Sequence, residues 1–424
     1  MSDSAPGLGT TDTITRQVHR GNRGVSSWWD TAAVCDLPGS FGPQDLLALI
    51  GILPAIRRMG FDAILLRLAA QDVAPQQSYI AKLVSGVHAA NLRVIVRVSP
   101  DDIIVSPLDS PPMVELGDDP GTLLERTRLL LEAGIDGVDL GMIDESAEDP
   151  DSWELTQRFS DTVNKQLAEV ASADSTVILT AEASVSTPEH FRHHLNEDWF
   201  HHLRDDSLFQ APWNAAELSR RIAEAYAARA PLGRAVAWRP ALAPRREGAI
   251  YQRVSAPGSW FDNASAQRIS AFLVYVASLP GALYLPFTSV GGELKLKKAG
   301  TTELHLLLSG LSQARFQHDL TTRMLHVRAE KNMGQATLAS IQGLSWAGPD
   351  VAVHLTGHIM VVLNASDRPV RVPGHHQPLL YSDGFVFSDG DATILQPETC
   401  AWFTPAAPRT HDPADRDRWE PRSR

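Results

Sequence analysis

The stretch TLLERTRLLLEAGIDGVDL, residues 122–140, decides the fold class. Its apolar residues first recur at helical spacing, up to Ala133, and Gly134 is a residue type that commonly ends a helix. Residues 137–140 follow at once and have the length and position of a strand. The stretch therefore predicts a helix that leads directly into a strand of a parallel sheet.

The same unit recurs on both sides of this stretch. Helical spacing covers residues 46–59, and short apolar strands are predicted at residues 63–66, 94–96 and 177–179. Strands that alternate with helices indicate a parallel sheet, either open or closed into a barrel. The number of units favours a (β/α)8 TIM barrel over a doubly wound sheet, and we assign it to residues 21–314.

A different rhythm begins near residue 315, where short alternating strands replace the strand–helix units. Strands are predicted at residues 359–364, 369–372, 379–382 and 393–396, with turn residues between them. We therefore assign residues 315–405 to a C-terminal antiparallel β-sandwich. Residues 1–20 and residues 406–424 are polar, and we expect both segments to be disordered tails.

Composition excludes several classes of protein. Hydrophobic residues make up 43% of the chain, enough for a sizeable core, and no apolar run reaches the length of a membrane span. Thirty-eight basic and fifty acidic residues give a net charge of −12, which disfavours nucleic acid and anionic membranes as partners. Cys35 and Cys400 are far apart, so neither a disulfide scaffold nor a zinc site is expected. The N-terminus has no apolar segment typical of a leader, and we expect a cytoplasmic protein.

Several short segments together resemble the α-amylase superfamily, in particular the α-glucosidase-like members of glycoside hydrolase family thirteen. They occur in the family's order along most of the chain. The resemblance implies a TIM barrel and a C-terminal β-sandwich. Active members carry an inserted domain after the third barrel strand, and residues 103–116 are too few to form one. The segments are WW at 28–29, GFDAI at 60–64, RVI at 93–95, AGIDGV at 133–138, APW at 211–213, LPG at 279–281 and VVLN at 361–364.

The resemblance also implies where the catalytic residues of such a barrel belong. Glycoside hydrolysis with retention needs a nucleophile and an acid/base carboxylate about 5 Å apart. The nucleophile motif G-F-R-x-D matches residues 137–141, so Gly141 occupies the nucleophile position, whereas Glu182 retains the acid/base position. The motif N-H-D-x-P-R matches residues 240–245 and puts Leu242 at the third aspartate. We therefore predict that the standard mechanism is lost.

A charge exchange accompanies these losses. The motif D-x-x-P-N-H matches residues 97–102, with Arg97 in place of its aspartate and Asp101 and Asp102 in place of its asparagine and histidine. Asp139 in turn replaces the arginine of G-F-R-x-D. Because the two strands are neighbours, we predict that Arg97 and Asp139 form an ion pair in the former sugar site. The alternative is that the two substitutions are unrelated.

The histidines near residue 200 suggest no metal site. Their spacing matches no metal-binding helix motif, and adjacent histidines point to different faces. We expect these side chains to be solvated or hydrogen-bonded locally, and we predict no metal or cofactor. The residues are His190, His193, His194, His201 and His202.

Three functions stay open. The leading hypothesis is a degenerate amylase-type pseudoenzyme, more a scaffold or regulatory subunit in carbohydrate metabolism than an enzyme, that pairs with a protein such as an active homologue. The second is an α-glucoside-binding or sensing protein that uses the remnant pocket around Glu182. The third is a divergent α-glucosidase with relocated catalytic residues.

Overall fold

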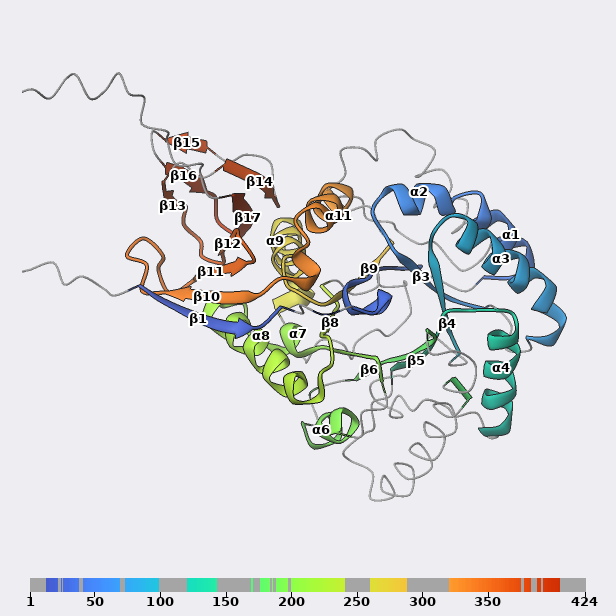
Figure 1. Cartoon of the computed structure of the whole chain (residues 1–424). Coiled ribbons are helices and arrows are strands. Elements are labelled where there is room, and N and C mark those ends of the chain that lie inside the picture. The colour runs from blue at the N-terminus through green and yellow to red at the C-terminus, as the bar shows by residue number, and fades with distance from the viewer. Residues whose placement is uncertain are drawn as a thin grey trace, which may run out of the picture.

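Two kinds of sheet form the described part of the chain (Figure 1). An eight-stranded parallel sheet curls into a nearly closed barrel, and antiparallel sheets follow it. The predicted TIM barrel with a C-terminal β-sandwich is therefore confirmed. The computed structural model describes residues 13–21, 24, 26–37, 41–68, 73–98, 120–142, 169–170, 176–183, 185, 188–196, 200–240, 260–287, 320–374, 377–382, 387–389 and 392–404.

The barrel strands pair in the order β7-β6-β5-β4-β3-β2-β9-β8, and β7 contacts β8 where the ring closes. Every ladder is parallel, as the strand–helix rhythm predicts. The loop after β4, where an inserted domain is predicted to be absent, lies outside the described residues. The strands are β2 (Ala33–Asp36), β3 (Ala63–Arg67), β4 (Arg93–Arg97), β5 (Gly137–Met142), β6 (Ile178–Ala183), β7 (His202–Asp205), β8 (Ala237–Trp238) and β9 (Ala282–Pro286).

Helices cover the outside of the barrel (Figure 1). The helical spacing predicted for residues 46–59 is confirmed, but it is divided between two helices, α1 and α2. Pro54 explains the break, since its ring would clash with the carbonyl of residue 50 in a continuous helix. None of the described helices has both the length and the apolar character needed to cross a membrane. The helices are α1 (Pro43–Ile50), α2 (Leu53–Arg58), α3 (Gln77–Ala89), α4 (Pro120–Glu132), α6 (Pro188–Asn196), α7 (Ser207–Gln210), α8 (Ala215–Arg229), α9 (Ala266–Ala277) and α11 (Leu320–Glu330).

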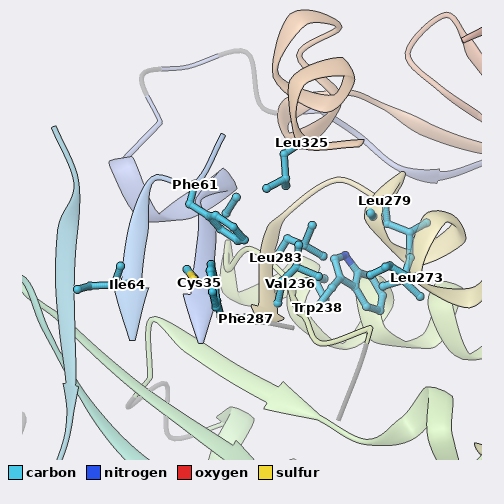
Figure 2. Close-up of a cluster of buried hydrophobic side chains, with 14 of the residues drawn as sticks. Cys35, Phe61, Ile64, Val236, Trp238, Leu273, Leu279, Leu283, Phe287 and Leu325 are labelled. Carbon is cyan, nitrogen blue, oxygen red and sulfur yellow. The ribbon is translucent and has the colours of Figure 1, made fainter. Parts of the chain in front are cut away.

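Side chains alternate along each barrel strand between the inside of the barrel and the helices. Ala63 and Leu65 of β3 belong to a cluster that joins residues from six barrel strands, and such residues meet only inside the barrel. Ile64, between them, lies in the larger cluster under the helices. Figure 2 shows part of this larger cluster, with Cys35 and Ile64 on neighbouring strands. The alternation therefore tells which side chain at the end of each strand points into the barrel.

The C-terminal region contains a six-stranded sheet and a three-stranded sheet. Their strand orders are β1-β10-β11-β12-β17-β14 and β13-β16-β15. Trp402 of β17 is fully buried, and its Nε1 donates to the Val274 carbonyl of α9 at 3.1 Å, which ties this region to the barrel. The strands are β10 (Leu338–Gln342), β11 (Val351–Thr356), β12 (Ile359–Asn364), β13 (Val370–Pro373), β14 (Gln377–Tyr381), β15 (Phe387–Asp389), β16 (Ala392–Leu395) and β17 (Thr399–Thr404).

The N-terminal segment departs from the predicted disordered tail. Residues Ile14–His19 form strand β1, which pairs antiparallel with β10 at the edge of the six-stranded sheet. Side chains 14–17 are exposed, so backbone hydrogen bonds hold the strand and the sequence shows no buried face. His19 stacks on Tyr226 of α8 with ring centroids 4.6 Å apart. Residues 1–12 and 405–424 lie outside the described residues.

Candidate functional site

Charged side chains fill the inside of the barrel at the carboxyl ends of its strands, the face where TIM barrels place their active sites. Both the alternation and the hydrogen bonds point these side chains inward. We call them the mouth cluster. Its members are Asp36 of β2, Arg67 of β3, Arg97 of β4, Asp139 of β5, Glu182 of β6, Arg204 of β7 and Arg239, which directly follows β8.

Asp139 lies at the centre of the mouth cluster and has no exposed surface. Its Oδ1 accepts from Arg97 Nε at 2.7 Å and from the Gly141 amide at 2.9 Å. Its Oδ2 accepts from Arg204 Nη2 and Thr180 Oγ1, both at 2.5 Å. The predicted ion pair between Arg97 and Asp139 is therefore confirmed. Burial by itself raises the pKa of this carboxyl, but Arg204 and Arg97 outweigh burial and hold the pKa well below its usual range.

Three arginines surround Glu182. Its Oε1 accepts from Arg97 Nη2 at 3.0 Å and from Arg204 Nη2 at 3.1 Å, and its Oε2 accepts from Arg239 Nη1. Only 8% of the side chain is exposed. Burial favours the protonated acid, yet the charges of Arg239, Arg204 and Arg97 prevail and lower the pKa of Glu182 to about 2.

Arg204 connects the mouth cluster to the layer below. Its guanidinium lies over the Tyr284 ring, 4.3 Å from the centroid. His202 is buried beside it, with Nε2 3.0 Å from the Trp29 carbonyl and Nδ1 2.7 Å from the Tyr284 hydroxyl. Burial and Arg204 lower the pKa of His202 to about 3, so the ring is neutral. Its Nε2 must then donate to the carbonyl, and Nδ1 accepts from the tyrosine.

The other histidines also make local contacts. His201 Nδ1 accepts from the Leu179 amide at 3.1 Å, and the rings of His193 and His194 lie 5.8 Å apart. The side chain of His190 lies outside the described part. Among the residues described, no group of three or more His, Cys, Asp or Glu side chains is arranged to hold a metal ion.

Asp36 differs from the other two carboxylates of the mouth cluster. It is partly buried, and within the described residues no hydrogen bond reaches its carboxylate, although the charges of Arg97, Arg239 and Arg204 act on it. Burial outweighs these arginines and raises its pKa. Asp36 therefore brings hydrogen-bond acceptors to the barrel mouth that no described side chain uses.

Gly141 occupies the position of β5 where the resemblance puts a nucleophile. Its φ of +71° lies in the left-handed region, and β5 shifts register against β6 between Asp139 and Met142. A residue with a side chain would strain the backbone at this position, because the left-handed region favours glycine. Asp101, Asp102 and Leu242, three other predicted site residues, lie outside the described residues.

Sequence analysis missed Asp36, Arg204 and Arg239. Arg239 directly follows β8, and its side chain contacts Glu182 from the end of that strand. Alternate residues of the predicted strands are the signal that points to such positions. This alternation would have predicted that Asp36 points into the barrel, because Val34, two residues earlier in β2, lies inside the barrel.

Comparisons with known proteins agree with this architecture. No protein-family model matches the sequence, and the comparison with curated proteins finds no match. Among solved structures, Amy13B from Eubacterium rectale is 12% identical, with a TM-score of 0.55 and coverage of 92% of this chain and 98% of that chain. An AmyP variant in complex with maltotriose is 14% identical, with a TM-score of 0.52 and coverage of 89% and 97%. Apo pullulanase from Paenibacillus barengoltzii is 11% identical, with a TM-score of 0.51 and coverage of 91% and 78%. At such identities the likeness establishes the fold alone.

Proposed function

We propose that this chain is a catalytically inactive member of the α-amylase superfamily, which serves as a scaffold or regulatory subunit in carbohydrate metabolism. The observation that carries the proposal is the state of Glu182. This carboxylate stands at the acid/base position and is hydrogen-bonded to Arg97, Arg204 and Arg239.

A general acid has to hold a proton near neutral pH and release it to the leaving group, so glycosidases raise the pKa of that carboxyl. The pKa of Glu182 is lowered to about 2 instead. At pH 7 only about one molecule in 10⁵ then carries the proton. Both carboxylate oxygens also accept hydrogen bonds from arginines, which keeps them from a glycosidic oxygen.

Strand β5 offers no carboxylate placed to act as the nucleophile. Gly141 has no side chain to form a glycosyl ester. Asp139 lies two residues earlier on the strand, about 6–7 Å deeper, and four hydrogen bonds engage its oxygens. These features support the loss of the two-carboxylate mechanism.

An activity assay tests the proposal. The purified full chain is incubated with 4-nitrophenyl α-glucoside and with maltotriose, beside an active amylase-family enzyme. We expect no turnover above the rate in buffer, for the wild type and for Glu182→Gln alike. Glu217→Gln, at a half-buried site on α8 away from the mouth cluster, is the matched control. Turnover by the wild type and Glu217→Gln that Glu182→Gln abolishes would reject the proposal and favour a divergent α-glucosidase.

The scaffold role and the compartment are part of the same proposal. A barrel that keeps its hydrophobic core but not the two catalytic carboxylates fits the role of a subunit that binds a second protein. The partner we propose is an active amylase-fold homologue. Cys35 and Cys400 are both buried free thiols, which fits a reducing cytoplasm. Affinity purification of the tagged chain from its host, followed by mass spectrometry and size-exclusion chromatography, should recover a stoichiometric amylase-fold enzyme. Recovery as a monomer alone would contradict the scaffold role.

A further inference from the structure

His354 of β11 lies where the C-terminal sheet meets the barrel. Ala352, two residues earlier, belongs to the large hydrophobic cluster under the barrel helices, so the alternation along β11 points His354 toward the barrel as well. Its Nε2 lies 2.9 Å from Oγ of Ser278, the residue that follows α9, and its ring lies 5.2 Å from the Tyr275 ring. Only 5% of His354 is exposed. A buried histidine therefore joins the C-terminal sheet to a barrel helix.

The Ser278 hydroxyl decides which nitrogen of the His354 ring carries the proton. Ser278 Oγ donates to the Tyr275 carbonyl at 2.6 Å and has no second proton to give. His354 Nε2 therefore donates to Ser278 Oγ, and the lone pair of the neutral ring is on Nδ1. An added proton goes to Nδ1, and within the described residues no group accepts a hydrogen bond from that nitrogen.

No carboxylate among the described residues balances a charge on His354. Burial is the cause that lowers the pKa of this ring to about 3. The formal charge nearby is itself positive, because Arg328 donates to the carbonyls of Ala277 and Leu279, on either side of Ser278. A protonated ring would thus be a buried cation without a counter-charge. The residues that the packed elements bring to this junction are Tyr275 of α9, Ser219 of α8, Ser340 of β10, Val361 of β12, Cys400 of β17 and Arg328 of α11.

We propose that His354 is a pH-sensitive latch between the barrel and the C-terminal sheet. The neutral ring fits the junction and donates to Ser278, whereas the protonated ring favours an open state, in which the sheet has moved off α9 and water reaches the ring. Opening would expose Cys400 and Trp402 of β17, which are both fully buried. The latch requires neither a sugar nor a partner protein, so the inference goes beyond the proposed function.

Proton linkage sets the size of the effect. In the open state the ring titrates near its ordinary pKa of 6.5, whereas in the closed state it stays neutral down to about 3. The open state therefore gains a proton below pH 6.5, and the equilibrium constant for opening rises about tenfold for each further pH unit. Between pH 7 and pH 5 the rise is roughly 25-fold. The junction is thus most stable above pH 6.5 and weakens as the pH falls.

The two native thiols report separately on the junction and on the barrel. Cys400 lies on β17 and Cys35 on barrel strand β2, and both are free and fully buried. The full chain is labelled with 4,4′-dithiodipyridine, which reacts with thiols in mild acid, and mass spectrometry identifies the modified cysteine. Each rate is divided by that of a free thiol at the same pH. We expect Cys400 to react faster than Cys35, and its rate to rise roughly 25-fold from pH 7 to pH 5.

Two histidine variants form a matched pair. His354→Gln keeps an N–H donor for Ser278 and cannot become charged, so its Cys400 rate should change less than about threefold between pH 7 and pH 5. His358→Gln, at an exposed position in the turn between β11 and β12, should retain the wild-type rise. Because each variant is compared with itself at two pH values, a loss of stability at neutral pH does not obscure the result.

Three results would overturn the inference: a Cys400 rate that does not rise toward pH 5, a rise that His354→Gln retains, or a Cys35 rate with the same size and pH dependence as that of Cys400, which would mean that the whole chain opens. If His354→Gln does not fold, the comparison of the two thiols in the wild type still decides. None of these results depends on hydrolysis or on a partner, so failure of the latch and failure of the proposed function are distinguishable.

Discussion

Asp139→Asn changes the mouth cluster with almost no change in volume. The new amide still offers one oxygen to Arg97 and the Gly141 amide, but its NH2 group then faces Arg204 Nη2 and Thr180 Oγ1, which donate to Oδ2 in the native chain. Two donors would meet a donor inside the barrel, and Arg204, which is 1% exposed, would lose one of its two carboxylates.

Breaking one partner of a buried ion pair generally costs about 3–5 kcal/mol, because the remaining charge is left uncompensated. Thr180 Oγ1 can turn to another acceptor, and Glu182 still neutralises part of the charge on Arg204. We therefore expect Asp139→Asn to lower the free energy of unfolding by about 3 kcal/mol, at the lower end of that range. Urea denaturation of the full chain, followed by circular dichroism and tryptophan fluorescence, measures the change.

A double variant isolates the cause. Arg204→Met removes the charge that Asp139→Asn leaves unpaired, so the double variant should be more stable than the sum of the single effects predicts, by about 1 kcal/mol or more. Asp367→Asn, whose side chain is 92% exposed, is the matched control and should stay within about 0.5 kcal/mol of wild type. A loss below about 1 kcal/mol for Asp139→Asn, or strict additivity in the double variant, would refute the reasoning.

Further predictions concern acid stability, a buried arginine and the junction with the C-terminal sheet. The pKa of Glu182 falls from 4.5 to about 2 on folding, so its ionised form stabilises the protein by about 3 kcal/mol above pH 4.5. This contribution disappears as the pH falls through about 2. In urea denaturation, the midpoint should therefore fall less steeply between pH 7 and pH 3 for Glu182→Gln than for the wild type. Arg328 donates to the carbonyls of Ala277, Leu279 and Gly281. Arg328→Met leaves these buried acceptors unpaired and should lower the free energy of unfolding by about 3 kcal/mol or more, measured by urea titration. An unchanged urea midpoint would contradict this role. Trp402→Phe removes the bond to the Val274 carbonyl and should cost about 1–3 kcal/mol, with a calorimetric melt that either stays single or separates the barrel from the sheet.

The parts of the fold that the sequence predicts are those with strong hydrophobic patterns. Strands β3 and β4 have apolar interiors, at residues 63–66 and 94–96, and Gly134 takes the left-handed φ of +87° after α4 that a helix stop favours. The ion pair of Arg97 and Asp139 was predictable because the two residues stand on neighbouring strands with exchanged charges.

The missed features have weak patterns for physical reasons. Strand β7 has four residues and β8 only two, so neither gives a recognisable apolar run. Without a predicted strand, the alternation that shows Arg204 and Arg239 to point into the barrel cannot be read from the sequence. Strand β1 is exposed on both faces over most of its length, so its composition is that of a tail. In each case backbone pairing with distant strands, which composition does not encode, decides the structure.

Stability and standard catalysis make opposite demands on Glu182. Every guanidinium bonded to the carboxylate stabilises its ionised form and so moves the pKa further from the neutral range in which a general acid works. These bonds hold Arg97 and Arg239 toward β6, whereas within the described residues no hydrogen bond reaches the carboxylate of Asp36. The hydrogen bonds that stabilise the ionised form of Glu182 are therefore the same contacts that argue against its use as a general acid.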